Sequence, residues 1–415
     1  MSMAMKTLNT TTQKCQVRSV ASLRGASSSS MRVSAVSPFN SASSPLSAKA
    51  AMATASASVA CKATTTQEAA TTTTTEYGMN TLNVWLLKQE AAGTIDSEMA
   101  IMLSSIATAC KQISSMVTRA AIADMTGLAG AENVQGEDQK KLDVISNEVF
   151  CNCLRASGRT SVIASEEEDT PVGVEETYAG NYICVFDPLD GSSNIDAGVS
   201  VGSIFGIYSE TEQCLVDDDD EEKLAKCVTN VCQPGNNLLA SGYCMYSSSC
   251  VLVLTVGDGV YGFTLDPSMG EFVLSHNNMK IPGTEGQKIY SFNEGNYAMW
   301  EEGLQNYMTS LKTGGAEQGS KPYSARYIGS LVGDFHRTLL YGGIYGYPGD
   351  SKNPNGKLRL LYECAPMSMI IEQAGGKGST GRERILDIDP TEVHQRVPYF
   401  VGSKHEIDYL ESFLK

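Results

Sequence analysis

The chain has 415 residues, of which 42% are hydrophobic and 19% charged, and its formal net charge is −16. This composition is typical of a soluble globular protein, and the length allows two domains. The negative charge argues against binding to nucleic acid or to anionic membranes. No stretch reaches the roughly 18 apolar residues that a membrane span needs. The twelve Cys do not indicate a secreted disulfide scaffold, because the chain is large and lacks a secretory signal.

The first 62 residues differ in composition from the rest. They contain seven of the 31 basic residues and no acid, since the first acid is Glu68, and they are rich in Ser and Ala. This pattern predicts an organelle transit peptide, and its hydroxyl-rich character favours the chloroplast over the mitochondrion. A disordered basic tail is the alternative. Residues 63–76 are Thr- and Ala-rich and are predicted to be a disordered linker that ends near Tyr77.

Helices are predicted next. Leu82, Trp85 and Leu86 indicate a short one, and Asp96 or Ser97 can cap a longer one. In the longer helix the apolar residues advance by three and four, which predicts one buried face. These residues are Leu103, Ile106, Cys110, Ile113 and Val117. A glycine-rich loop is predicted for residues 127–136, followed by a helix that begins with charged residues.

Two predicted strands, residues 160–164 and 182–186, end in acids. The acids are Glu166, Glu167, Asp187 and Asp190. A doubly wound sheet would place these two strand ends side by side. Pro188 is expected to end the second strand, so that two carboxylates three residues apart could hold a divalent cation. The alternative is a solvated acidic turn.

Gly191, Ser192 and Ser193 follow these acids. Glycine permits close approach of the backbone, and the serines suit the start of a helix whose free N–H groups point at an anion. Carboxylates for a metal beside amides for a phosphate indicate metal-assisted phosphate chemistry.

An exposed loop is predicted for residues 209–233, because the six adjacent acids from Asp217 to Glu222 cannot pack in a core. Cys214, Cys227 and Cys232 flank this run and are not expected to be buried packing residues. A disulfide between Cys214 and Cys227 would stabilise the fold by about 3 kcal/mol in the loop-entropy model. In an intracellular compartment such a bridge is more often regulatory than structural.

A cluster of turn residues after position 281 predicts a domain boundary, with one domain at 77–281 and a second at 282–415. Before it, a strand is predicted at 203–208, a β-hairpin over 251–265 and a strand at 272–274. After it, a strand is predicted at 288–292 and helices at 300–311, 331–341, 365–373 and 405–414. Residues 342–349 are predicted to form a loop that contains Tyr345 and Tyr347.

Several short motifs together resemble the class I fructose-1,6-bisphosphatases. They are Lys140–Val144, Ser165–Glu167, Asp187–Asp196, Tyr290–Gly295, Ala325–Tyr327 and Gly356–Glu363. The resemblance runs from about Gly93 to the C-terminus. It implies an α/β fold, a layered α/β/α/β/α sandwich of the sugar-phosphatase superfamily that includes inositol monophosphatases. It also implies two domains, usually a homotetramer, and hydrolysis of the 1-phosphate of fructose 1,6-bisphosphate to fructose 6-phosphate.

The resemblance implies a role for each acid of the site. The ligands of two or three Mg²⁺ ions would be Glu166, Asp187, Asp190 and Glu363, with the Leu189 carbonyl adding an oxygen. Hard oxygen ligands without His suit Mg²⁺. Glu167, with Asp143 beside it, would orient and deprotonate the attacking water. Glu137 stands where family members carry an Asp, which leaves its part in binding a third metal ion open.

The substrate contacts are implied in the same way. The N–H groups of Gly191 and Ser192, beside Ser193, would hold the 1-phosphoryl group. The sugar and the 6-phosphate would be bound by Asn293, Tyr327, Tyr347 and Lys357. Arg326 would reach that phosphate across a subunit interface. Arg359 would either bind near the 1-phosphate or form a structural ion pair.

The leader and the cysteine-bearing loop resemble those of the chloroplast members that thioredoxin regulates. The resemblance therefore implies a Calvin-cycle enzyme of the chloroplast stroma, activated when f-type thioredoxin reduces the loop disulfide. The acidic run would attract a basic reductant. Sedoheptulose-1,7-bisphosphatase is disfavoured, because its short cysteine pair nearer the N-terminus is absent. A non-catalytic sugar-phosphate-binding regulator is disfavoured because Asp143 and Glu167 are both present.

Overall fold

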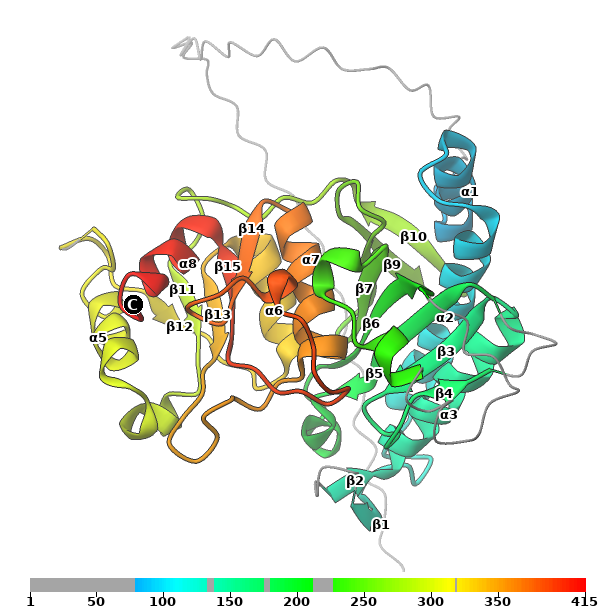
Figure 1. The fold of residues 1–415 in the computed structure, drawn as a ribbon, viewed down its shortest axis with the longest axis horizontal. Coiled ribbons are helices and arrows are strands. Elements are labelled where there is room, and N and C mark those ends of the chain that lie inside the picture. Colours follow the sequence, from blue (N-terminus) through cyan, green and yellow to red (C-terminus); the bar gives the residue numbers. More distant parts are fainter. Residues whose placement is uncertain (1–78, 133–137, 175–179, 212–226, 318) are drawn as a thin grey trace, which may run out of the picture. The chain divides into compact units, whose positions relative to one another are not determined.

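Two β-sheets alternate with three layers of helices in the computed structural model (Figure 1). It describes residues 79–132, 138–174, 180–211, 227–317 and 319–415, which all belong to one compact unit. The predicted transit peptide and linker, Glu137 and Cys214 lie outside the described residues. The boundary at 281/282 stays a prediction.

The larger sheet has eight strands in the order β10-β9-β8-β7-β6-β5-β3-β4. The strands are β3 (Thr160–Ser165), β4 (Val172–Gly173), β5 (Tyr182–Asp190), β6 (Val201–Ser209), β7 (Ala240–Tyr246), β8 (Cys250–Thr255), β9 (Tyr261–Asp266) and β10 (Glu271–His276). β3 and β5 are parallel, and the other pairs are antiparallel. The predicted hairpin over residues 251–265 is confirmed as β8 and β9.

The second sheet has five strands in the order β12-β11-β13-β15-β14. They are β11 (Ile289–Ser291), β12 (Ser324–Ala325), β13 (Ile344–Tyr347), β14 (Gly376–Ser379) and β15 (Tyr399–Ser403). A separate two-stranded sheet contains β1 (Leu128–Glu132) and β2 (Asp138–Lys140).

Each helix layer buries an apolar face against a sheet. The outer layer on the larger sheet contains α1 (Leu82–Ala92), α2 (Ser97–Val117) and α3 (Lys141–Ser157). The layer between the two sheets contains α6 (Leu331–Tyr341) and α7 (Ala365–Gln373). The outer layer on the smaller sheet contains α5 (Glu302–Leu311) and α8 (Lys404–Glu411). The predicted α/β/α/β/α sandwich is confirmed.

Local sequence signals explain where several helices begin. Asp96 caps α2, and its carboxylate accepts a 2.8 Å hydrogen bond from the Met99 N–H. The predicted apolar stripe of α2 is confirmed for four of its five residues, which are buried: Leu103, Ile106, Cys110 and Ile113. Pro366 stands in the first turn of α7, where its missing N–H costs no helical hydrogen bond.

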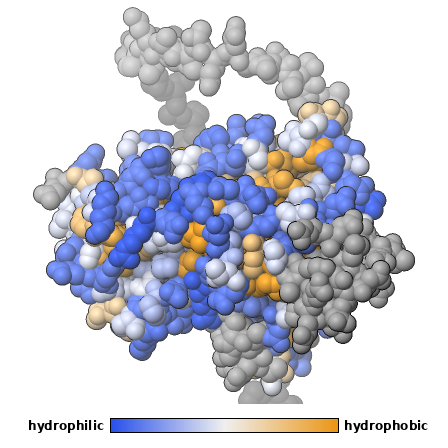
Figure 2. All heavy atoms as spheres, viewed as in Figure 1, coloured by the Kyte–Doolittle hydropathy of each residue, from blue (hydrophilic) through white to orange (hydrophobic). Residues whose placement is uncertain are grey.

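Helix α2 is also the one described helix that is long and apolar enough to cross a membrane, with a mean hydropathy of 1.2. Its buried residues pack into the core beneath the larger sheet together with α1 and α3. The core helix of a globular protein meets the same criterion. In Figure 2 hydrophilic residues cover most of the visible face, and hydrophobic ones gather in small patches.

Three sequence predictions about loops and strands are wrong. Residues 128–132 of the predicted glycine-rich loop form β1, and residues 344–347 of the predicted tyrosine-containing loop form β13. β13 lies in the middle of the smaller sheet, and its alternation of glycine and tyrosine hid its strand character. Pro188 does not end β5, because pairing with β6 resumes at Asp190 after an irregularity in register.

The prediction that the loop cysteines are not buried is also wrong for Cys227. Its side chain is only 2% exposed and belongs to the core between the sheets, where Val231 and Tyr208 also lie. Cys232 is partly buried against the same core. The acidic run from Asp217 to Glu222 lies outside the described residues, which resume at Cys227.

A buried histidine of α6 predicts acid sensitivity of the fold. His336 contacts the Tyr243 hydroxyl at 2.7 Å, and burial lowers the pKa of His336 to about 4. The unfolded chain, with a His pKa near 6.5, therefore binds the proton first as the pH falls. We expect His336 to contribute about 2 kcal/mol to the loss of unfolding free energy between pH 7.5 and pH 5.

Urea unfolding of the wild type and of His336→Gln at both pH values measures this effect. The variant should lose less stability than the wild type over this pH interval. Equal losses would contradict the assignment.

Candidate active site

The two predicted acidic strand ends lie side by side. β3 and β5 pair in parallel, with Ser165 opposite Phe186, so both chains reach the same edge of the sheet. Beyond the pairing, the Glu166 N–H donates to the Phe186 carbonyl at 3.2 Å. The parallel pairing therefore brings Glu166 and Glu167 next to the acids of β5.

A third segment contributes Glu363 to this group. It lies in a single π-helical turn, η5 (Leu360–Cys364), directly before α7. Carboxylate oxygens of Asp187, Asp190 and Glu363 all lie within 4.8 Å of one another, and all three residues are buried. This spacing would let one cation contact all three carboxylates.

Burial and mutual repulsion of their negative charges disfavour the ionised form of these acids. Burial, together with the charges of Glu166 and Asp190, raises the pKa of Asp187 well above its usual range. Burial raises the pKa of Asp190 to about 6 and that of Glu363 to about 8. A divalent cation would offset this concentration of negative charge, and the oxygen-only donor set suits a hard cation.

Helix α6 orients one of these acids. Oδ2 of Asp190 accepts hydrogen bonds from the Val332 N–H at 3.0 Å and from the Ser330 hydroxyl at 3.2 Å. The N-terminal end of a helix stabilises a carboxylate in this position. Ser330 was not singled out from the sequence; its place before an apolar helix marks it as an N-cap but cannot reveal that it meets Asp190.

The acids open into a cavity of about 410 Å³. Its lining contains most of the predicted site residues, together with Lys140 and Leu358, which the sequence analysis missed. The lining is Lys140, Glu166, Glu167, Asp187, Leu189, Asp190, Gly191, Ser192, Ser193, Tyr347, Lys357, Leu358, Arg359 and Glu363.

Glu167 lines this cavity, whereas Asp143 does not line it but lies beside Ser192, which does. Asp143, in the first turn of α3, accepts a hydrogen bond from the Lys140 N–H at 2.8 Å, and burial raises its pKa to about 6. Burial also raises the pKa of Glu167 to about 7, aided by the charges of Glu166 and Asp143. Gln139 opposes that rise by donating to Glu167 at 2.5 Å. Gln139 is a further residue that the sequence did not mark.

Gly191 forms the corner between the acids and the short 3₁₀ helix η2 (Ser192–Ala197). Its φ of 74° lies in the left-handed region, and an added Cβ would meet the Ser330 Cβ at 3.1 Å. Glycine is therefore required here by both backbone conformation and space. Lys140 forms a 2.8 Å ion pair with Asp196, which ties η2 to β2.

Arg359 is buried and forms a 2.7 Å ion pair with Glu166. Its backbone N–H donates to the Glu363 carboxylate. In this structure Arg359 therefore makes the ion pair that was one of its two predicted roles, while it also lines the cavity.

Three predicted substrate residues do not line the cavity. Asn293 is exposed and caps the short helix η4 (Glu294–Met299), with its side chain accepting from the Gly295 N–H. Arg326 is exposed at the end of β12. Tyr327 is 38% exposed. Burial raises its pKa, and the nearby side chains of Tyr347, Asp334 and Asp190 add to that rise. Because Tyr347 and Asp190 line the cavity, Tyr327 lies near it.

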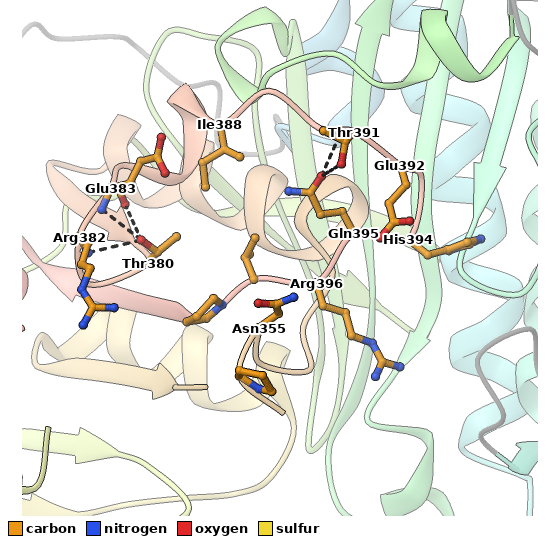
Figure 3. A pocket seen from close by; sticks show the side chains of 13 residues that line it. Asn355, Thr380, Arg382, Glu383, Ile388, Thr391, Glu392, His394, Gln395 and Arg396 are labelled. Atoms are coloured by element: carbon orange, nitrogen blue, oxygen red, sulfur yellow. Dashed lines mark hydrogen bonds between the residues drawn. The ribbon is translucent and has the colours of Figure 1, made fainter. Parts of the chain in front are cut away.

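A larger cavity of about 820 Å³ lies among C-terminal loops (Figure 3). Its charged side chains do not converge, since Arg382 and His394 lie at opposite ends of the opening. Arg382 is engaged by Glu301 at 2.8 Å, and His394 contacts the Tyr362 hydroxyl at 2.9 Å. The smaller cavity is lined by five acids, three of which converge, and is therefore the candidate active site.

Comparison with known proteins gives consistent matches along the described chain. Residues 80–277 match the family model of the fructose-1,6-bisphosphatase N-terminal domain, and residues 284–415 match that of its C-terminal domain. The chloroplastic fructose-1,6-bisphosphatase of Brassica napus is 65% identical over 360 residues, which cover 86% of this chain and 87% of that protein. The chloroplastic enzyme of Triticum aestivum is 69% identical over 342 residues, or 82% of this chain and 83% of that one.

A solved structure is also similar. The holo form of Leishmania major fructose-1,6-bisphosphatase superposes with a TM-score of 0.75 at 43% sequence identity, covering 81% of this chain and 99% of that one.

Proposed function

The chain belongs to the fructose-1,6-bisphosphatase family and is a phosphoric monoester hydrolase of the chloroplast type, and from this premise we propose its mechanism and regulation. We propose that it hydrolyses the 1-phosphate of fructose 1,6-bisphosphate with Mg²⁺ as cofactor, in the Calvin cycle of the chloroplast stroma. The observation that supports this most is the convergence of Asp187, Asp190 and Glu363 within 4.8 Å, beside the turn that begins at Gly191.

In this proposal Glu166, Asp187, Asp190, Glu363 and the Leu189 carbonyl hold Mg²⁺. The bound metal supplies positive charge that offsets the phosphoryl oxygens as negative charge develops on them. Glu167, with Asp143 beside it, orients and deprotonates the attacking water, and the two acids can share a proton. The N–H groups of Gly191 and Ser192 donate to the phosphoryl oxygens.

The far end of the substrate requires positive and hydroxyl groups. We propose that Lys357 binds the 6-phosphate, with Tyr347 lining the path between the two phosphates. Tyr327 and Asn293 join Lys357 and Tyr347 in binding the sugar and the 6-phosphate, whereas Arg326 of a second copy of the chain reaches that phosphate across the subunit interface. A homotetramer, as the family resemblance implies, would provide that interface.

Substrate choice tests the reaction. Phosphate release by the reduced, Mg²⁺-supplemented full-length chain should be faster with fructose 1,6-bisphosphate than with sedoheptulose 1,7-bisphosphate at equal concentration. An equal or reversed preference would favour the sedoheptulose alternative. Absence of release from both would favour the sugar-phosphate-binding regulator.

We propose that a loop disulfide switches this activity and that f-type thioredoxin reduces it. Two contacts support a path from the loop to the acids. Thr211, at the start of the loop, donates to the Asn230 side chain, and Cys227 packs in the core with Tyr208 of β6. β6 pairs directly with β5, which carries Asp187 and Asp190, so tension at Cys227 would reach the acidic strand.

The pairing of Cys214 with Cys227 has a direct test. Cys214→Ser should stay active after oxidation, whereas the oxidised wild type should need reduced thioredoxin. If the oxidised variant is as inactive as the oxidised wild type, this pairing is wrong. Cys232→Ser is the matched variant, because Cys232 is the alternative partner, and it should respond as the wild type does.

A further inference from the structure

Two cysteines outside the proposed active site and the redox loop lie in contact at the β7–β8 turn. The Sγ atoms of Cys244 and Cys250 are 3.5 Å apart. In the antiparallel register Tyr246 stands opposite Cys250 and Leu252 opposite Cys244. Cys244 and Cys250 are therefore diagonal neighbours on one face of the hairpin.

Only one of the two thiols can be reached by a small molecule. Cys244 is fully buried, whereas Cys250 is half-buried and lines a cavity of about 510 Å³. This cavity lies between the C-terminal end of α2, the helix η2 and the β7–β8 turn, and Ser114, Ile195 and Tyr246 also line it. A reagent that enters it meets Cys250 first.

The surroundings shift the pKa values of the two thiols in opposite directions. Hydrogen bonds from Cys244 and Ser114 lower the pKa of the Cys250 thiol, while burial raises the pKa of Cys244 well above its usual range. The thiolate is the nucleophile in disulfide exchange, so Cys250 is suited to react first.

We propose that Cys250 and Cys244 form a reactive dithiol that a small-molecule disulfide, such as oxidised glutathione, converts into an intrachain disulfide. The Cys250 thiolate attacks one sulfur of the reagent, which forms a mixed disulfide and expels one glutathione thiolate. The Cys244 thiol then loses its proton and attacks Cys250 Sγ, which expels the second. The two cysteines are oxidised, and one molecule of glutathione disulfide is reduced to two of glutathione.

The local structure allows this closure. A disulfide has an S–S distance of about 2.05 Å, so the sulfurs must approach by about 1.5 Å. Diagonal pairs start with their backbones farther apart than directly opposite ones, and the hairpin must therefore adjust. The turn between them, residues 247–249, consists of three exposed serines that carry no core packing.

Cyanogen bromide cleavage isolates Cys250 in a fragment of its own. Met245 lies between the two cysteines, and cleavage after Met245 and Met269 releases residues 246–269, whose one cysteine is Cys250. The preceding fragment, residues 126–245, contains Cys244. Cys110, whose side chain also contacts the Cys244 thiol and is thus a competing partner, lies in residues 103–116. The folded full-length chain is treated with oxidised glutathione, the remaining thiols are blocked, and the fragments are separated without reductant.

We expect residues 246–269 to be lost as a free fragment and to appear joined to residues 126–245, and reductant should release them. In Cys244→Ala the same fragment should instead carry one glutathionyl group, and in Cys250→Ser it should be free and unmodified. An unmodified free fragment in the wild type, a link to residues 103–116, or a persistent link to residues 126–245 in Cys244→Ala would each overturn the proposal.

Discussion

Glu167→Gln is expected to lower the rate of phosphate release by about 10²–10⁴-fold, the range that a general acid–base group contributes. Glutamine keeps the size of the side chain and an acceptor for the Gln139 amide, which donates to Glu167 at 2.5 Å. It cannot accept the proton of the attacking water. Steady-state kinetics with saturating Mg²⁺ measure the loss, which should fall on kcat, because Glu167 is not among the proposed metal ligands.

The matched control is Asp169→Asn. Asp169 follows the same strand, is exposed and does not line the cavity. It should keep the wild-type rate within about twofold, since surface substitutions away from special features have small effects. Undiminished activity of Glu167→Gln would remove Glu167 from the catalytic role and leave Asp143 as the remaining acid proposed to act on the attacking water.

Glu363→Gln should raise the Mg²⁺ concentration needed for half-maximal activity by about 100-fold or more. Even residues that only orient metal ligands are worth about 10–100-fold in metal affinity. Glutamine still accepts a hydrogen bond from the Arg359 N–H, so the π-helical turn should keep its shape. A Mg²⁺ titration of phosphate release in a chelator-treated protein gives the half-saturation value for wild type and variant.

Stability of the metal-free protein separates a lost ligand from a damaged fold. Asp187, Asp190 and Glu363 are buried with like charges around them. Removing one of these acids should leave the metal-free variant at least as stable as the metal-free wild type. An unchanged Mg²⁺ requirement would show that Glu363 is not a ligand, and a large drop in metal-free stability would show that its role is structural.

Much of the fold is predictable from local patterns. The apolar spacing of α2, the cap at Asp96 and the glycine-rich turn at residues 257–259 between β8 and β9 each depend on residues close in sequence. The sequence analysis missed β13 because its four residues, Ile-Tyr-Gly-Tyr, place a glycine between two tyrosines. Nothing local distinguishes such a segment from a loop. Its strand character comes from its neighbours β11 and β15, which are far away in the chain.

The candidate site divides in the same way. The sequence by itself singled out the candidate residues of the site, because carboxylates after two predicted strands and a glycine–serine turn are local features with a limited set of uses. Only the tertiary structure decided that Glu363 reaches the β5 acids, that Ser330 and Gln139 orient two of the carboxylates, and that Arg359 pairs with Glu166. These contacts join segments separated by 28 to 193 positions, and such separations are closed by the packing of whole layers, which no short stretch of sequence encodes.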